Sequence, residues 1–161
     1  MPFSNIIKVV IFCIVVCHSS TVVGQVKTVE FEQLGKLQVI EKKPVLVFIQ
    51  TDWCKYCNQM KQSLKKDQLS TEILNQKFYV VYFNAEERRT ISFAGREFRF
   101  KPTGATTGVH ELAEALGTID GSLSYPTLCF LNENNEILYQ YGAYMDSKSF
   151  PKTLQIILRK N

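Results

Sequence analysis

The order of apolar segments along this chain of 161 residues predicts an α/β domain with a mixed central sheet. Two apolar runs, at 45–49 and 78–83, are too short for buried helices and are rich in β-branched and aromatic residues, so we expect strands covered on both faces. Helical patterns separate the strand-like segments, which implies parallel strands joined by crossovers. Two further segments, at 127–131 and 136–141, predict a hairpin across the turn at 132–135 that adds an antiparallel edge. We expect a sheet of about four to five strands flanked by helices.

The first two helices are predicted on either side of the first strand. Residues 29–42 carry acidic side chains near the start and basic ones near the end, which suits the helix dipole, and Pro44 ends this helix. A second helix is expected over 54–66, because apolar residues recur there on one helical face. A short helix over 71–76, capped by Ser70, would lead into the second strand.

Small elements are predicted between the second strand and the final hairpin. Residues 91–100 alternate in polarity around Gly95 and predict a hairpin. Residues 102–108 are expected to form a loop, and 109–116 a short helix that ends at Gly117.

A last helix is predicted to follow the final hairpin. Asp146 or Ser149 can cap it, and Pro151 lies in its first turn, where proline is tolerated. Its apolar face is formed by three residues, Leu154, Ile157 and Leu158.

The composition is that of one soluble globular domain. Apolar residues make up 45% and charged residues 21% of the chain, which excludes a disordered protein. The formal net charge of +4 is too mild, and too scattered, to predict a nucleic-acid partner. We find no internal repeat and no linker, so a single domain is expected.

Residues 1–24 are predicted to be a secretory signal peptide, which leaves the domain at 25–161. Lys8 precedes an apolar run over 9–17 that is shorter than the roughly 20 residues needed to span a bilayer. An uncleaved anchor or buried helix, and a lipid anchor at Cys17, are the alternatives. Export would place the remaining cysteines where disulfides form and persist.

The strongest chemical signal is Trp53-Cys54-Lys55-Tyr56-Cys57, which follows a buried strand and opens a helix. Cys54 would lie at the helix N-terminus, where free N–H groups, the helix dipole and Lys55 stabilise a thiolate. Cys57, one turn further in, is expected to be more buried and less acidic. An exposed thiolate that attacks and a shielded partner that resolves suit dithiol redox chemistry.

Three other interpretations of the cysteine pair stay open. The pair could be a structural disulfide, although so short a loop gains little from cross-linking. A zinc site needs four ligands, and only Cys129 and His110 remain to complete one in the processed chain. The cysteines could also be a chance pair of buried residues. Outside a metal site, we expect Cys129 to be a small buried hydrophobe and His110 a surface or capping residue.

A second motif, Tyr125-Pro126-Thr127, begins the strand expected at 127–131. The strand at 45–49 and the motif around the cysteines precede this second motif. Together, the three features make the chain similar to the thioredoxin-like family from about residue 29 to residue 158. The resemblance implies a thioredoxin-like fold, with an inserted hairpin before a loop in which the Tyr125–Pro126 bond is cis and lies against the dithiol.

The same resemblance implies a thiol:disulfide oxidoreductase in which Cys54 and Cys57 are catalytic. Five residues would contact the substrate peptide: Trp53, Lys55, Tyr56, Tyr125 and Pro126. No cofactor is needed and no metal is expected, because the electrons reside in the dithiol. Expected partners are substrate proteins with cysteines or disulfides and an upstream redox partner.

A narrower resemblance concerns location. The pattern at 108–113 ahead of 124–127 is similar to exported thioredoxin-like proteins of Gram-negative bacteria, which implies the periplasm. We expect a monomer there, with no membrane span in the mature chain.

Two departures from the family pattern bear on direction. Phe48 stands where thioredoxins carry a buried Asp, and Tyr82 stands where they carry a lysine, so a general cytosolic-type thioredoxin is disfavoured. Family oxidants often place a histidine where this chain has Tyr56, so we expect a reductase or isomerase. The segment 88–124 exceeds the family minimum and could lie over the active site or decorate an edge. Two other function classes stay open: a binding module without redox turnover, and a copper or zinc carrier that uses the cysteine pair.

Overall fold

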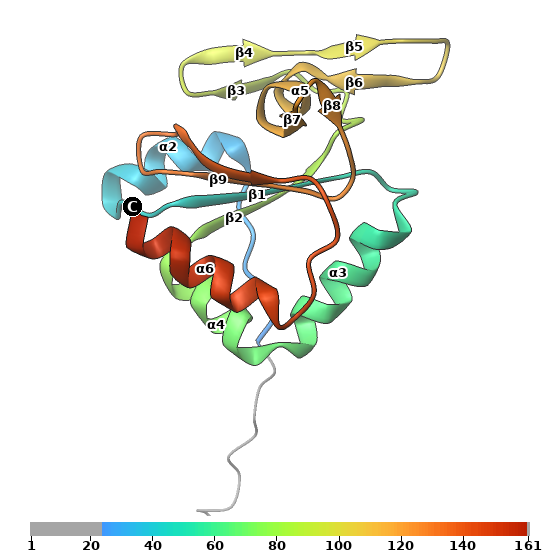
Figure 1. The fold of residues 1–161 in the computed structure, drawn as a ribbon. Coiled ribbons are helices and arrows are strands. Elements are labelled where there is room, and N and C mark those ends of the chain that lie inside the picture. The colour runs from blue at the N-terminus through green and yellow to red at the C-terminus, as the bar shows by residue number, and fades with distance from the viewer. Residues whose placement is uncertain (1–23, 161) are drawn as a thin grey trace, which may run out of the picture.

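Four strands form the central sheet in the order β10-β9-β1-β2 (Figure 1). The computed structural model describes residues 24–160. β1 (Val45–Gln50) pairs in parallel with β2 (Tyr79–Asn84) and antiparallel with β9 (Thr127–Leu131). β10 (Ile137–Tyr141) pairs antiparallel with β9 at one edge. The predicted mixed α/β sheet is confirmed, while the predicted signal peptide falls, except for Gly24, outside the described residues.

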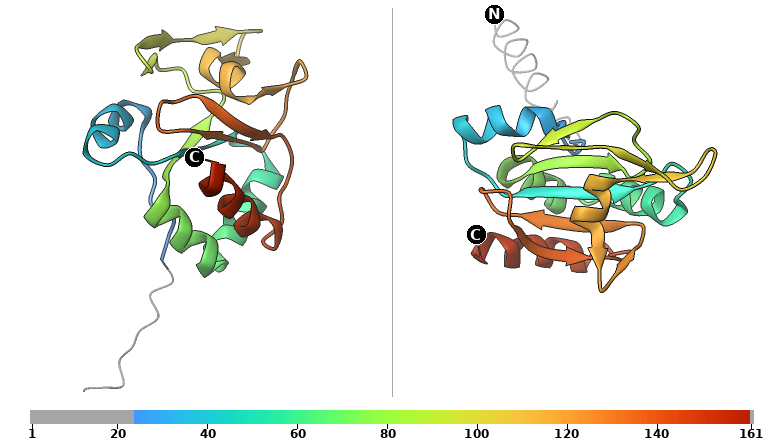
Figure 2. Two further views of the ribbon diagram at one scale, coloured as in Figure 1. Left: turned by 60° about the vertical axis from the view of Figure 1, so that its left-hand side comes forward. Right: turned by 90° about the horizontal axis from the view of Figure 1, so that it is seen from above.

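Helices cover both faces of this sheet (Figures 1 and 2). One face packs against α3 (Lys55–Lys66), α4 (Gln68–Lys77) and α6 (Ser149–Lys160). The other packs against α2 (Phe31–Ile40) and α5 (Glu111–Gly117). Among these residues, no helix is both long and apolar enough to cross a membrane.

The central strand β1 contributes to the core on both sides. Its side chains alternate between two apolar clusters, and all five from Val45 to Ile49 are 0% exposed. Leu46 and Phe48 belong to the cluster under α3, whereas Val47 belongs to the cluster under α2 and α5. This burial is what the continuous apolar run predicted.

Two helix boundaries differ from the sequence prediction because of capping. The first helix begins at Phe31, since Glu30 forms a capping box with Gln33. α4 begins before Ser70, and the predicted Ser70 cap is wrong. Asp67 is the cap: its Oδ1 accepts the Ser70 backbone N–H at 3.3 Å, and its Oδ2 accepts the Ser70 hydroxyl at 2.6 Å. Ser70 therefore lies inside the helix, fully buried.

The segment between β2 and β9 forms hairpins outside the main sheet, over α5 (Figure 1). The predicted first hairpin is confirmed as β3 (Ile91–Phe93) and β4 (Arg96–Phe98), with Gly95 at φ +75° in its turn. β5 (Phe100–Pro102) and β6 (Gly108–His110) form a second hairpin, so most of the predicted loop is a turn. A third pair, β7 (Thr118–Ile119) and β8 (Ser122–Leu123), was not predicted.

The second hairpin also shortens the helix expected over 109–116. Val109 and His110 belong to β6, so the helix begins only at Glu111. Gly108 permits this hairpin, because a Cβ atom there would collide with the Phe100 ring on the facing strand.

Candidate functional site

A disulfide joins Cys54 and Cys57, with an S–S distance of 2.04 Å, just beyond the end of β1. The turn is held by a hydrogen bond from the Cys54 N–H to the Thr51 carbonyl at 3.2 Å. Cys54 is the N-cap of α3, and its Sγ accepts the Cys57 backbone N–H at 3.1 Å. The first sulfur therefore lies where the helix offers unpaired donors.

The two cysteines differ less in exposure than predicted. Cys54 is 4% exposed and Cys57 is 0% exposed, so the expected order holds, but Cys54 is not openly exposed in the disulfide form. Cys57 packs with Met60 and Leu64 in the apolar cluster under α3. Cys54 belongs to the same cluster, so it is the helix N-terminus, and not the surroundings, that favours the thiolate at Cys54. The first turn of α3 carries no acidic residue to oppose negative charge at its end.

An aromatic rim borders the disulfide. The Trp53 ring packs edge-to-face on the Tyr125 ring with centroids 5.9 Å apart, and Trp53 is 66% exposed. The Tyr125–Pro126 peptide bond is cis, and Tyr125 contributes to the apolar clusters on both faces of the sheet. Burial raises the pKa of the Tyr125 hydroxyl, and the negative charges of Glu86 and Glu114 raise it further. Lys55 and Tyr56 are exposed on the first turn of α3.

Glu86 is a site residue that the sequence analysis missed. Its Oε1 accepts the indole N–H of Trp53 at 3.2 Å and so helps to orient that ring. Glu86 follows the end of β2, and β2 runs parallel to β1. Because parallel strands end at the same edge of a sheet, the position two residues after β2 is a signal that could have suggested proximity to Trp53.

An aromatic pair shares the apolar cluster of the two cysteines. Phe48 and Tyr82 are register partners on β1 and β2, with ring centroids 5.4 Å apart. Both pack in the cluster that contains Cys54 and Cys57. Burial raises the pKa of Tyr82 to about 12, so its hydroxyl is neutral at ordinary pH. The two residues that depart from the family pattern therefore lie side by side on one face of the sheet.

The Lys61 ammonium group lies over the Tyr82 ring of this pair. Its Nζ lies 5.9 Å from the centroid of the Tyr82 ring. The pKa of Lys61 is lowered, mainly by burial. The charge of Asp52 opposes this shift and that of Lys65 adds to it.

Buried groups predict a loss of stability at alkaline pH. Burial raises the pKa of the Cys129 thiol from 9.0 to about 12, as it raises that of Tyr82 from 10.0 to about 12. The unfolded chain loses these protons first, so both groups make the free energy of unfolding fall between about pH 9 and pH 12. Cys129→Val removes the contribution of the thiol. The free energy of unfolding of this variant should therefore begin to fall nearer pH 10, where Tyr82 ionises in the unfolded chain. Urea unfolding of both proteins across this range checks the prediction, and identical pH profiles would contradict it.

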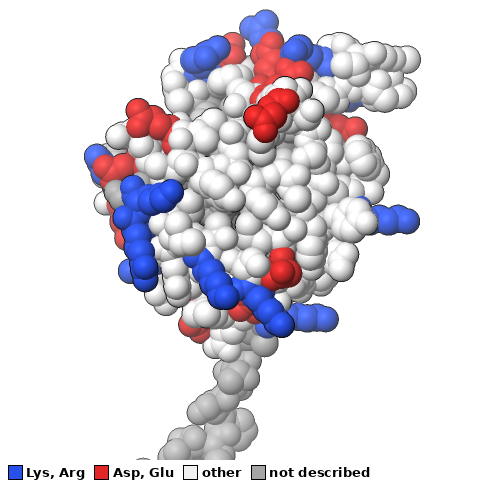
Figure 3. Space-filling model, viewed as in Figure 1, with Lys and Arg blue, Asp and Glu red and all other residues white. Residues whose placement is uncertain are grey.

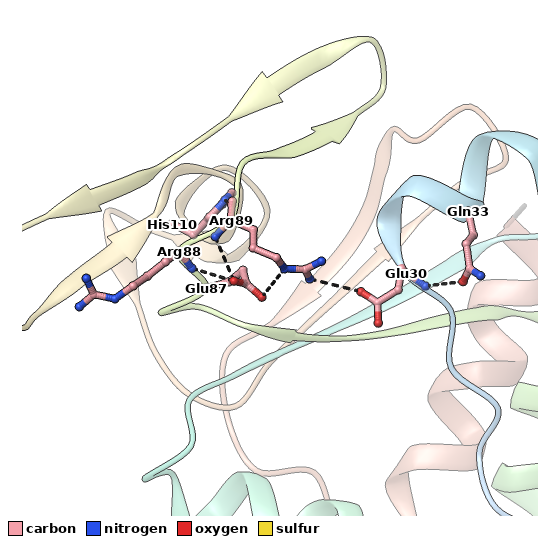
Figure 4. A network of polar contacts seen from close by, with 6 residues as sticks. All are labelled: Glu30, Gln33, Glu87, Arg88, Arg89 and His110. Atoms are coloured by element: carbon pink, nitrogen blue, oxygen red, sulfur yellow. Dashed lines mark hydrogen bonds and ion pairs between the residues drawn. The ribbon is translucent and has the colours of Figure 1, made fainter.

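His110 links the inserted hairpins to the segment that carries Glu86 (Figure 4). Its Nδ1 accepts the Leu112 N–H at 3.1 Å, and its Nε2 lies 3.0 Å from the Arg89 carbonyl. Because Nδ1 accepts a hydrogen bond, Nε2 carries the ring proton and donates it to the Arg89 carbonyl oxygen. The expectation of a capping residue is confirmed, but that of a surface residue is wrong, because His110 is 0% exposed.

One exposed ion pair connects the same segment to the start of α2, and another lies within the segment. The Arg89 guanidinium lies 3.2 Å from Glu87 and 3.7 Å from Glu30, and Figure 4 shows Arg88 pointing away from this network. The Glu87 carboxylate accepts backbone N–H groups from Arg88 and Arg89. These hydrogen bonds, ahead of the charge of Arg89, lower the pKa of Glu87.

The four residues considered for a zinc site do not meet. Cys54 and Cys57 lie in the cluster on one face of the sheet, whereas Cys129 lies in the cluster on the other face. His110 packs against Phe83 on the Cys129 side. Within residues 24–160, no group of three or more His, Cys, Asp or Glu residues is placed to hold a metal ion.

Comparisons with known proteins agree with this architecture. A model of a thioredoxin-like domain family matches residues 31–157. A thioredoxin-fold protein from Helicobacter pylori is 21% identical, with 72% of this chain and 69% of that chain covered and a TM-score of 0.56. A disulphide isomerase from Xylella fastidiosa is 18% identical, with 79% and 86% covered and a TM-score of 0.53. A thioredoxin from Thermus thermophilus is 18% identical, with 85% and 90% covered and a TM-score of 0.60. No curated protein sequence matches the chain.

Proposed function

The chain belongs to the thioredoxin-like family, and on that premise we propose that it is an exported thiol:disulfide oxidoreductase that exchanges the Cys54–Cys57 dithiol with substrate proteins. The observation that carries the proposal is the hydrogen bond from the Cys57 N–H to the Cys54 sulfur at the start of α3. A helix terminus that already donates to this sulfur also stabilises the thiolate formed on reduction.

The exchange needs no group beyond the two cysteines. In the reducing direction, the Cys54 thiolate attacks a substrate disulfide, one substrate sulfur leaves as a thiolate, and a mixed disulfide forms. Cys57 then gives up its proton and attacks the Cys54 sulfur, which closes the Cys54–Cys57 disulfide and releases the second substrate thiol. Two electrons pass to the substrate, and an upstream redox partner must return them.

The rim suits an extended peptide as substrate. Trp53 and Tyr56 are each more than 60% exposed at the disulfide, and large exposed aromatic residues are typical of binding surfaces. Trp53 is already oriented by Glu86 and by the Tyr125 ring, so little ordering is needed on binding. The loop at Pro126 would offer backbone beside the disulfide, and Lys55 is exposed on the first turn of α3.

Trapping tests the function directly. A Cys57→Ala variant purified from its producing cell should hold substrate proteins through a disulfide to Cys54, and dithiothreitol should release them. Cys54→Ala, the matched control, should retain none of these proteins by a disulfide. Partners that remain bound to the Cys54→Ala/Cys57→Ala double variant would favour the binding module. Stoichiometric copper or zinc after reducing purification would favour the metal carrier.

Export has its own test. Intact mass of the protein from its producing cell should correspond to a chain that begins near Gln25 in the periplasm of a Gram-negative bacterium. An uncut Met1, or a lipid on Cys17, would contradict this part of the proposal.

The direction of exchange predicts a reduction potential. A strong oxidant needs a heavily stabilised reduced form, and Tyr56 adds no cation beside Cys54. The aromatic pair of Phe48 and Tyr82 supplies no buried cation either. The missing carboxylate at position 48 acts in the opposite direction, because it bears on how readily Cys57 loses its proton in the second step. We therefore expect a potential of about −200 mV or below in glutathione buffers at neutral pH. A value near −120 mV, typical of the strongest bacterial oxidants, would show that the direction is wrong.

A further inference from the structure

The Glu86 carboxylate has a fixed position beside the disulfide. The Glu86 backbone N–H donates to Asn84 Oδ1 at 2.9 Å, and the N–H of the residue between them donates to the carbonyl of the last residue of β1 at 2.7 Å. Its Oε1 accepts the indole N–H of Trp53, the residue that precedes Cys54. The carboxylate is therefore held from both its backbone and its side chain, next to the residue that carries the reacting sulfur.

The cations that follow Glu86 in the sequence bind other groups. The Arg88 guanidinium lies 4.9 Å from the centroid of the Phe100 ring and donates to the Thr106 carbonyl at 3.2 Å. Arg89 pairs with two other carboxylates (Figure 4). Within residues 24–160, Glu86 forms no ion pair, and its Oε2 has no hydrogen-bond partner. One oxygen and the full negative charge are thus available to a bound molecule.

The exposed indole ring and this carboxylate together suit a basic side chain. Trp53 is 66% exposed, and its ring is oriented by Glu86 and by the Tyr125 ring. Aromatic faces attract cations, and the guanidinium group of an arginine can stack on a ring while it binds a carboxylate. The charge of Glu86 also raises the pKa of Tyr125, so it acts on both rings of the rim. Glu114, whose charge acts there too, is already paired with Lys101 at 2.7 Å.

We propose that Glu86 is a specificity-determining residue that selects substrate proteins with a lysine or arginine beside the reacting cysteine. This preference rests on the function proposed above, in which the substrate cysteine bonds to Cys54. In that mixed disulfide, the residues next to the substrate cysteine lie close to Trp53, because consecutive residues of an extended peptide are only about 3.3 Å apart. A long basic side chain from one of them lies along the indole ring and reaches Glu86 Oε2.

Lys55 is a charge that opposes this preference. It follows Cys54, is exposed, and forms no ion pair or side-chain hydrogen bond within residues 24–160. Figure 3 shows that charged side chains of both signs lie around the margin of this face, whereas its middle is uncharged. The Glu86 carboxylate is held by a hydrogen bond and the Lys55 ammonium group is not, so water and salt screen the lysine more effectively. Lys55→Gln should therefore strengthen the preference for basic substrates.

Reaction with matched peptides tests the proposal. Three synthetic peptides of equal length, each with one internal disulfide, carry Arg, Gln or Glu on both sides of the first cysteine. Oxidation of the reduced protein is followed through the fluorescence of Trp53, the one tryptophan of the chain. At low ionic strength, we expect the Arg peptide to react about fivefold or more faster than the Glu peptide, and the two rates should converge as salt is added. Equal rates at low ionic strength would overturn the preference.

Two isosteric variants locate the origin of the preference. Glu86→Gln keeps an acceptor for the Trp53 indole N–H and removes the charge, so the ratio of the Arg to the Glu rate should fall to about twofold or less. Glu72→Gln makes the same change of charge on α4, which follows the far end of α3, and should keep the ratio of the unsubstituted protein. A ratio that Glu86→Gln leaves unchanged, or that both variants lower equally, would refute the role of Glu86.

The uncharged peptide separates this preference from the proposed function. Both charged peptides are measured on each variant, so a general loss of rate cancels in the ratio. If the reduced protein does not react with the Gln peptide, the proposed function is wrong and the preference falls with it. Reaction with all three peptides at one rate would leave the function in place and overturn the preference alone.

Discussion

Cys54→Ser is expected to lower the rate of disulfide reduction by about 10³-fold or more, because it removes the attacking nucleophile. The serine hydroxyl stays protonated at neutral pH, and the donors at the start of α3 then have no thiolate to stabilise. Turnover of a peptide disulfide with dithiothreitol as electron donor measures the effect.

Cys57 and Cys129 provide matched controls. Cys57→Ser should keep the first attack and lose release, so a stoichiometric mixed disulfide accumulates while turnover stops. Cys129→Ser should keep most of its activity, because Cys129 lies in the cluster on the other face of the sheet. If Cys54→Ser accumulated the mixed disulfide and Cys57→Ser lost the first attack, the assigned roles would be reversed.

Phe48→Asp is expected to destabilise the protein more than any other substitution considered above. Phe48 is 0% exposed, and removing a buried phenylalanine side chain costs about 3–5 kcal/mol in free energy of unfolding. A carboxylate in its place would also be desolvated opposite Tyr82, whose neutral ring cannot balance the charge. Urea unfolding at neutral pH should show a loss of about 4 kcal/mol or more.

A second substitution tests whether positions 48 and 82 act as one unit. Tyr82→Lys in the Phe48→Asp protein places a cation opposite the new carboxylate, and we expect it to recover about 1–3 kcal/mol of the loss. Phe48→Leu is the volume-matched control and should cost much less than Phe48→Asp. Strictly additive effects in this double-mutant cycle would contradict the coupling.

The main sheet and the disulfide could be predicted because their signals are local. The apolar run from Val45 to Ile49 predicts a strand covered on both faces, and the Cys54–Cys57 spacing indicates the start of the helix that follows it. The α4 cap was misplaced by three residues because Asp67 and Ser70 both have side chains suited to capping. Sequence alone does not decide which of the two the backbone selects.

Contacts between distant segments were beyond the reach of local patterns. β7 and β8 contain two residues each, too few for a period of two to be visible. Glu86 reaches Trp53 across 33 positions. The opposition of Phe48 and Tyr82 needs the register of β1 on β2, which two apolar runs do not specify.

The position of β1 between β2 and β9 has a consequence for native-state hydrogen exchange. Its amide protons should be among the slowest to exchange, released only in openings that approach complete unfolding, because strands flank it on both sides and its side chains from Val45 to Ile49 are fully buried. The turn with the disulfide follows this strand directly. The β5–β6 hairpin pairs over three residues per strand and should open at far lower free energy. The turn that carries the sulfurs thus follows the part of the molecule that should open last.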